Sequence, residues 1–200
     1  MKSNSLIKRL VGFSLIIDAI ILDQISKWLI LENVFRPKLN EPSLGFLEWI
    51  TSSFRLPLIS TEISPFFNLT MVWNEGISFG LFQTGNPWPL IIMALGIVII
   101  FGFWMVKSDK WMEIIALSMV IGGALGNIID RLHFKAVADF LDFHINGWHY
   151  PAFNLADSFI TVGIVMLVTY SLFFDRQNQK EAHINAVSYT HLTLPTILLV

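Results

Sequence analysis

Four long apolar segments constrain the fold of this chain more than any other feature of its sequence. A helix needs about 20 predominantly apolar residues to cross the roughly 30 Å hydrocarbon core of a bilayer. The segments that approach or reach this length cover residues 10–31, 89–106, 111–129 and 152–174. The sequence therefore predicts an all-α membrane protein in which four transmembrane helices form a bundle.

The composition agrees with a membrane solvent. Of the 200 residues, 54% are apolar and only 14% are charged, which is unlike a soluble domain. The net charge of −2 supplies no basic stripe for phosphates, so nucleic acid is not an expected partner. The absence of cysteine excludes thiol catalysis and disulfides. We expect one integral membrane domain over residues 1–180, followed by a tail, 181–200, that is disordered or foreign to the functional unit.

Basic residues indicate how the chain is oriented. They precede the first apolar segment, separate the second from the third and follow the fourth: Lys2, Lys8, Arg9; Lys107, Lys110; Arg176, Lys180. Four crossings place all three groups on one side, which the positive-inside rule makes the cytoplasmic side. Both termini are then cytoplasmic, and the long connections 32–88 and 130–151 face outward. Asp18 and Asp23 interrupt the first segment, which favours an uncleaved membrane helix over a signal peptide.

The first outward connection predicts a small β-sheet. Residues Phe66–Trp73 are rich in β-branched and aromatic side chains and are bounded by Pro65 and Asn74, as strands often are. Asn74–Gly76 then reads as a turn and Ile77–Phe82 as a return strand. We expect this sheet to lie on the outer surface of the membrane.

Polar residues gather at the outer ends of the predicted helices. Asp23 and Lys27 are four residues apart and share a helix face, where they form a salt bridge or orient an outer loop or the substrate. Asn127, Asp130 and Arg131 share another face, just after a Gly-x-x-x-Gly step that permits close helix packing. Asp130 is expected to neutralise Arg131 locally, unless Arg131 binds a substrate carbonyl or a lipid headgroup.

Two further aspartates stand next to the apolar segments. Asp139 and Asp157 are functional candidates because a carboxylate close to hydrocarbon is costly to keep charged. If they lie within reach of each other they would share a proton and act as a catalytic dyad, with Asn154 beside Asp157. Alternatively, Asp157 is stabilised by the helix dipole and Asp139 is a solvated loop residue. Asp18 is expected to be buried in the first helix with a partner across the bundle.

Two other kinds of site are disfavoured by spacing. Ser26 and Lys27 are adjacent, so on a helix they point about 100° apart and Lys27 is poorly placed to activate the hydroxyl. Three of the five histidines, His133, His144 and His149, could be arranged around a metal, but they do not fit a helical ligand pair and have no acidic ligand at a suitable offset. We therefore expect no metal and no cofactor.

Five motifs, taken together, resemble the lipoprotein signal peptidase family, also called signal peptidase II. They are Asp23-Gln-x-Ser-Lys27, Asn74-x-Gly76 followed by Phe79, Gly122-Gly-Ala-Leu-Gly-Asn-x-x-Asp-Arg131, Val137-x-Asp-Phe140 and Phe153-Asn-Leu-Ala-Asp157. The resemblance covers roughly residues 10–175. The segment 36–65 is longer than is usual in the family, and residues 185–200 match nothing in it.

The resemblance implies an aspartic endopeptidase of the bacterial inner membrane with its active site near the periplasmic leaflet. Such an enzyme removes signal peptides from diacylglyceryl-modified prolipoproteins by cutting just before the lipidated cysteine. It implies catalytic roles for Asp139 and Asp157. The positions that match residues lining or supporting the family's site are Asn74, Asn127, Arg131, Asn154, Asp23, Lys27 and Asp130.

The chemistry expected of such a pair needs only the two carboxyl groups and water. The ionised carboxylate accepts a proton from the attacking water, while the protonated one stabilises the oxyanion and assists the leaving amine. A proton- or ion-coupled transporter is the alternative, because intramembrane carboxylates also mark proton relays. A noncatalytic scaffold with paired acids is a third reading. Partners are then prolipoproteins and membrane lipids, and we expect a monomer.

Overall fold

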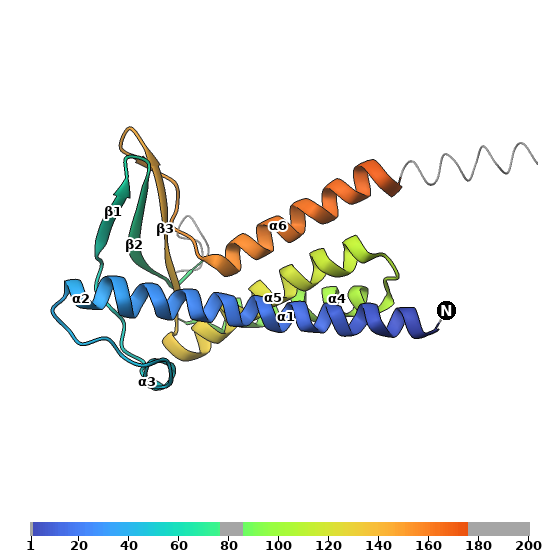
Figure 1. Cartoon of the computed structure of the whole chain (residues 1–200), viewed down its shortest axis with the longest axis horizontal. Helices are drawn as coiled ribbons and strands as arrows, with labels where there is room; N and C mark the ends of the chain where they lie inside the picture. The colour runs from blue at the N-terminus through green and yellow to red at the C-terminus, as the bar shows by residue number, and fades with distance from the viewer. Residues whose placement is uncertain (1, 77–85, 176–200) are drawn as a thin grey trace, which may run out of the picture.

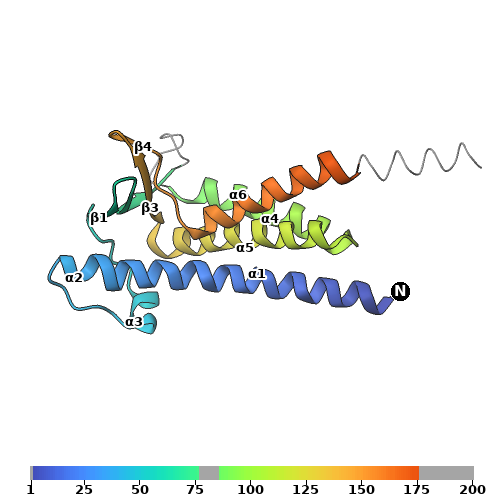
Figure 2. The same ribbon diagram turned by 45° about the horizontal axis from the view of Figure 1, so that its top comes forward.

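A helical body carries a small antiparallel sheet at one end (Figure 1). The computed structural model describes residues 2–76 and 86–175. The long helices are α1 (Lys2–Ile30), α4 (Trp88–Lys107), α5 (Trp111–Phe134) and α6 (Leu155–Tyr170). The short helical elements are η1 (Leu31–Phe35), α2 (Arg36–Lys38), α3 (Phe46–Thr51) and η2 (Ser171–Asp175). The N-terminus lies at the end opposite the sheet in both views (Figure 2).

Helix α5 is the centre of the body and packs against α1, α4 and α6. Its glycines permit this close approach. A Cβ atom added to Gly122 would lie 2.6 Å from the Cβ of Ala19 in α1, and one added to Gly123 would lie 2.4 Å from the backbone oxygen of Ala156 in α6. The close packing that the Gly-x-x-x-Gly step predicted is therefore present, and it serves two neighbouring helices.

Among the described residues, three helices are long and apolar enough to cross a membrane. They are α4, α5 and the continuous stretch Leu155–Phe173. The expected fourth span, α1, is a helix of 29 residues, but Asp18, Asp23 and Lys27 interrupt its apolar run. The count of four spans is thus not established by length and composition.

The sheet has the order β1–β2–β3–β4, and each neighbouring pair is antiparallel. Its strands are β1 (Ser60–Ser64), β2 (Phe67–Asn74), β3 (Val137–Ile145) and β4 (Trp148–His149). The strand predicted at 66–73 is confirmed as β2, but β1 and β3 were missed. In particular, Asp139 lies within β3 opposite Val72 and is not a solvated loop residue. The predicted return strand at 77–82 and the tail lie outside the described residues.

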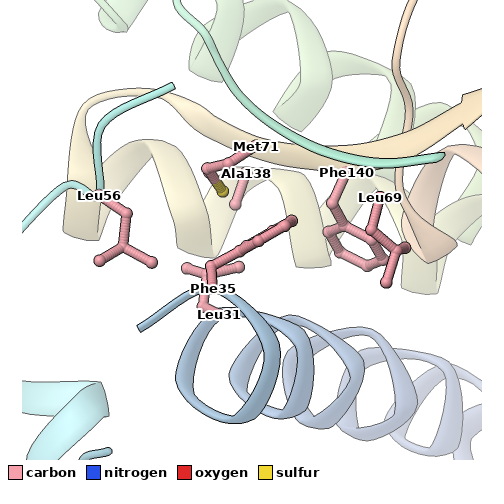
Figure 3. Close-up of a cluster of buried hydrophobic side chains, with 7 residues drawn as sticks. All are labelled: Leu31, Phe35, Leu56, Leu69, Met71, Ala138 and Phe140. Atoms are coloured by element: carbon pink, nitrogen blue, oxygen red, sulfur yellow. The ribbon is translucent and has the colours of Figure 1, made fainter. Parts of the chain in front are cut away.

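A hydrophobic cluster joins the sheet to the end of the first helix. Phe35 and Leu31 of η1 pack against side chains of β2 and β3 and against Leu56, which lies between α3 and β1, as Figure 3 shows. The buried members of this cluster are Leu31, Phe35, Leu56, Leu69, Met71, Ala138 and Phe140. The cluster therefore holds the sheet against the end of the first helix, where η1 continues α1.

Helix boundaries differ from expectation at two places that matter for the site. Helix α5 extends to Phe134, five residues past the expected end, and stops where Lys135 adopts a left-handed conformation with φ 61°. Helix α6 begins at Leu155 and not at Ala152, because the side chain of Asn154 caps it. Asp157 therefore lies in the first turn of α6.

Asp18 is not buried, contrary to expectation. It lies on the exposed side of α1 with Ile17 and Ile21, whereas Ile16 and Ala19 face the bundle. The reason is the helical period: the residues that follow Ile16 on the packed face are those near positions 19, 23 and 27, which leaves position 18 on the outer side.

The glycine contacts yield a test of the packing around α5. Gly123→Ala should lower the free energy of unfolding by about 1–3 kcal/mol, since a methyl group cannot be placed against the α6 backbone without moving it. Gly96→Ala in α4 is the matched control, because no atom lies within 4 Å of its added Cβ. Thermal unfolding of both variants in detergent measures the difference, and equal melting temperatures would contradict the packing.

Candidate active site

Asp139 and Asp157 lie where β3 and the start of α6 meet the last turns of α5 (Figure 1). Asp139 is 1% exposed. Asp157 is half-buried and lines two cavities. One carboxyl group is therefore shielded from solvent, and the other is open to a ligand.

Asn154 contacts both carboxyl groups. Its Nδ2 donates to Oδ1 of Asp139 at 2.8 Å, and its backbone N–H donates to Oδ2 of Asp157 at a longer 3.4 Å. The backbone N–H of Asp157 donates in return to Oδ1 of Asn154 at 3.0 Å, which completes the cap of α6. A single residue, through its side-chain amide and its backbone N–H, thus brings together two acids that come from different elements.

Each carboxyl group has a second amide donor of its own. Nδ2 of Asn74, at the end of β2, donates to Oδ2 of Asp139 at 3.0 Å. Nδ2 of Asn127, in α5, donates to Oδ1 of Asp157 at 2.8 Å. The oxygen of Asn127 accepts from Nδ2 of Asn154 at 3.2 Å, so the three asparagines named at sequence level converge on the two acids.

The surroundings of Asp139 favour its protonated form. Burial is the largest cause and the nearby carboxylate of Asp157 the second, and against the hydrogen bond from Asn74 they raise the pKa of Asp139 to about 8. An ordinary aspartic acid has a pKa near 4, as a rough reference. These surroundings therefore favour a protonated Asp139 at neutral pH.

A fully buried ion cluster lies next to the two acids. Nζ of Lys27 is 2.7 Å from Oδ2 of Asp23 and 2.7 Å from Oδ2 of Asp130, and all three side chains are 0% exposed. The expected Asp23–Lys27 pair is present. The expected pairing of Asp130 with Arg131 is wrong: Asp130 turns inward to Lys27 because that ammonium lies inside the bundle, where an unpaired carboxylate would be costly.

This cluster also holds the backbone beside each site acid. Oδ2 of Asp130 accepts from the N–H of Ala138 at 3.1 Å, and Oδ1 of Asp23 accepts from the N–H of Ala156 at 3.0 Å. Ala138 and Ala156 directly precede Asp139 and Asp157 in the chain. The ion cluster is therefore coupled to the position of both acids.

Gln24 is a supporting residue that the sequence reasoning did not single out. Its Nε2 donates to Oδ1 of Asp130 at 2.9 Å and to Oδ2 of Asp23 at 3.1 Å. It stands directly after Asp23 in the first motif, and this adjacency was the one available signal.

Arg131 is placed to bind something other than the protein. Its Nη1 makes only a long contact of 3.4 Å with the backbone oxygen of Asn127, and its buried Nε has no partner among the described residues. The charges that act on it most are those of Asp157 and Asp139. It therefore offers a guanidinium group at the edge of the site.

Two cavities meet at Asp157. The first, about 340 Å³, lies between α4, α5 and α6, is mostly apolar and reaches Arg131 and Asn74. The second, about 490 Å³, lies between α6 and residues 150–153. A ligand in either cavity would therefore lie beside Asp157.

His133, His144 and His149 do not form one cluster. His144 and His149 stack with their ring centroids 4.8 Å apart, and Nδ1 of His149 is 2.8 Å from Oδ1 of Asp142. His133 instead stacks on Phe134. Within residues 2–76 and 86–175, no group of three His, Asp or Glu side chains is arranged to hold a metal ion.

Known proteins with similar sequences point to one family. A family model described as signal peptidase (SPase) II matches residues 15–173. A lipoprotein signal peptidase of Burkholderia thailandensis is 42% identical over 111 residues, which is 54% of this chain and 67% of that protein. One of Anaplasma phagocytophilum is 44% identical over 121 residues, which is 60% of this chain and 74% of that protein.

The fold is also similar to that of a solved bacterial membrane enzyme. That structure, determined by the in meso method at 2.3 Å resolution, superposes with a TM-score of 0.64. It is 28% identical and covers 86% of this chain and 92% of its own. The likeness therefore extends over most of both chains.

The buried cluster generates a prediction about stability. Lys27→Met should destabilise the protein by about 3–5 kcal/mol, because it leaves two buried carboxylates without their counter-ion. Lys38→Met, at an exposed position, is the control and should unfold like the wild type. Thermal unfolding in detergent tests this, and a Lys27 variant as stable as the control would refute the assigned role.

Proposed function

Because the chain belongs to the signal peptidase II family, we propose that Asp139 and Asp157 are its two catalytic residues. The protein is a membrane peptidase that cleaves the signal peptides of lipoproteins. This assignment replaces the ion-coupled transporter that the intramembrane acids had left open. The catalytic proposal rests on the position of Asn154, which donates to Asp139 from its side chain and to Asp157 from its backbone N–H.

In the proposed mechanism, Asp157 is the base and Asp139 is the acid. Asp157 is the partly exposed member and faces both cavities, so its carboxylate accepts a proton from the water that attacks the scissile carbonyl. Asp139 carries the shared proton, hydrogen-bonds the oxyanion and then protonates the leaving amine. Transfer of the proton from Asp157 back to Asp139 restores the starting state.

The amides and the guanidinium orient these groups. Asn74 and Asn127 each donate to one carboxyl group, so neither acid can rotate freely away from the reacting bond. We propose that Arg131, with its free donor atoms at the cavity, binds a backbone carbonyl of the substrate beside the scissile bond. The buried ion cluster of Asp23, Lys27 and Asp130 supports the site by holding the backbone next to each of the two acids.

The proposed substrates are diacylglyceryl-modified prolipoproteins, cut just before the lipidated cysteine. The apolar lining of the cavity between α4, α5 and α6 supports this choice, since it suits a hydrophobic signal peptide that enters from the bilayer. The acyl chains are already in hydrocarbon before binding, so they fix the depth of the scissile bond more than they add affinity.

We propose a topology of four membrane crossings, in which α1 crosses in addition to the three helices identified by length and composition. Apart from Asp18, the outer face of α1 is largely apolar, with Leu10, Phe13 and Ile21 exposed, while Asp23 and Lys27 are buried inside. Nζ of Lys8 bonds the backbone oxygen of Asp109 at 2.5 Å, so the basic start of α1 lies beside the α4–α5 turn. This supports cytoplasmic termini and a site at the outer leaflet, and we propose in addition that the enzyme is a monomer.

The catalytic assignment is tested with conservative variants of both acids. Asp139→Asn and Asp157→Asn should each lower the cleavage rate by at least about 100-fold, because each removes one proton-transfer group. Asp142→Asn, three residues further along β3 and bonded to Thr70, is the control and should remain active. A gel-shift assay on lipid-modified preprotein measures cleavage, with the unlipidated precursor alongside. Substantial turnover by either site variant would defeat the assignment.

The pH dependence follows from the shared proton. Since Asp139 must be protonated, kcat/KM should fall as the pH rises through about 8, the raised pKa of its carboxyl group. A profile from pH 5 to 10 on a peptide substrate locates this upper limb. Activity that still increased one unit above that pH would show that Asp139 is not the acid.

A further inference from the structure

We propose that Arg55 is a positioning residue for the active site, because it holds the Asn74–Gly76 turn that presents the Asn74 amide to Asp139. The inference rests on the proposed role of Asp139. Arg55 belongs to the outer segment 36–65, and sequence reasoning gave it no function. It does not touch either acid, so its effect passes through the turn.

Arg55 connects three parts of the site's frame. Its Nε donates to the backbone oxygen of Phe134, the last residue of α5, at 2.7 Å. Its Nη1 donates to Oε1 of Glu75, just after β2, at 2.5 Å. Its Cζ lies 5.7 Å from the ring centroid of Trp73. One guanidinium therefore spans the end of the helix that carries Asn127 and the end of the strand that carries Asn74.

The backbone around Arg55 is itself fixed. The next residue, Leu56, is 2% exposed and belongs to the hydrophobic cluster beneath the sheet, as Figure 3 shows. Its carbonyl oxygen accepts from Nε1 of Trp73 at 2.8 Å. The backbone at Arg55 is thus held in place. Its side chain can therefore restrain the turn and is not merely a mobile surface charge.

The turn transmits this restraint to Asp139. Oδ1 of Asn74 accepts from the N–H of Gly76 at 3.1 Å, which leaves Nδ2 to donate to Oδ2 of Asp139 at 3.0 Å. Glu75 is the residue between these two contacts. Because the amide of Asn74 is oriented by the turn, a change in the position of Glu75 changes the direction of the bond to Asp139.

The ion pair is too exposed to matter greatly for folding. The side chains of Arg55 and Glu75 are 31% and 44% exposed. Pairs of this kind contribute little to the stability of a protein. Their removal is therefore expected to leave the fold intact, which makes a catalytic readout possible.

The pH profile reports the position of Asn74. Its hydrogen bond lowers the pKa of Asp139 against burial and against Asp157 of α6. The other charged groups that face Asp139 are Lys27 of α1, which lowers its pKa, Asp130 of α5, which raises it, and the guanidinium of Arg131 of α5, on which the charge of Asp139 acts. None of these groups changes when the turn is loosened, so a weaker bond from Asn74 should raise the pKa of Asp139.

The test compares Glu75→Gln with Glu41→Gln. Both remove a glutamate that pairs with an arginine of the outer segment, since Oε2 of Glu41 lies 2.7 Å from Nη1 of Arg36. We expect Glu75→Gln to lower kcat/KM about three- to tenfold and to move the upper limb of its pH profile upward by about 0.5–1 unit. Glu41→Gln should change neither.

The sign of this shift separates positioning from simple electrostatics. Loss of the negative charge of Glu75 by itself would lower the pKa of Asp139 and move the limb downward. Arg55→Ala should move the limb upward as well. It should add almost nothing to Asn74→Ala in the double variant, because both act through the same hydrogen bond.

The outcomes also distinguish this inference from the catalytic proposal. Unchanged or downward-shifted limbs in Glu75→Gln, or additive effects of Arg55→Ala and Asn74→Ala, would overturn the role of Arg55 while Asp139→Asn stayed inactive. An active Asp139→Asn enzyme would instead overturn the catalytic assignment itself. Melting temperatures of the variants near that of the wild type show that the shifts are not caused by unfolding.

Discussion

The ammonium of Lys27, enclosed between Asp23 and Asp130, joins the elements that carry the two site acids. Three charged side chains with no exposure are costly to desolvate, and one cation serves two acids. The remaining acceptor capacity is met by Gln24 and by the N–H groups of two alanines. Because those alanines belong to β3 and α6, neutralising the cluster requires four elements to take one arrangement.

The two site acids inherit their properties from this arrangement. Their direct hydrogen-bond donors are the neutral amides of Asn74, Asn127 and Asn154. Amides orient a carboxyl group without supplying the positive charge that would strip it of its proton. The buried cation nearby, Lys27, is already shared by two other carboxylates, and Arg131 acts on the pair from the edge of the site without forming an ion pair with either acid in the described part of the chain. The pair can therefore keep one proton in a buried site, which proposed acid–base catalysis requires.

The sequence predicts the local features of this protein well. Apolar length located three long helices within a few residues, and the cost of a carboxylate near hydrocarbon singled out Asp139 and Asp157. Partners distant in the chain were not predictable: Asp130 was assigned to its neighbour Arg131 and not to Lys27. The N–H donors of the alanines carry no side-chain signal at all. Strand β3 was missed because two aspartates interrupt its apolar pattern.

Helix α1 is missed as a membrane span by composition because it supplies charged residues to the site. A helix that supplies buried charges to a site cannot also be uniformly apolar, so Asp23 and Lys27 remove it from the helices that composition identifies. These charges face the bundle interior, where they are paired, so the helix turns its apolar side to lipid. Asp18 is the exception, exposed on that side. For the proposed fourth crossing, the relevant quantity is therefore the polarity of the outer face and not that of the whole segment.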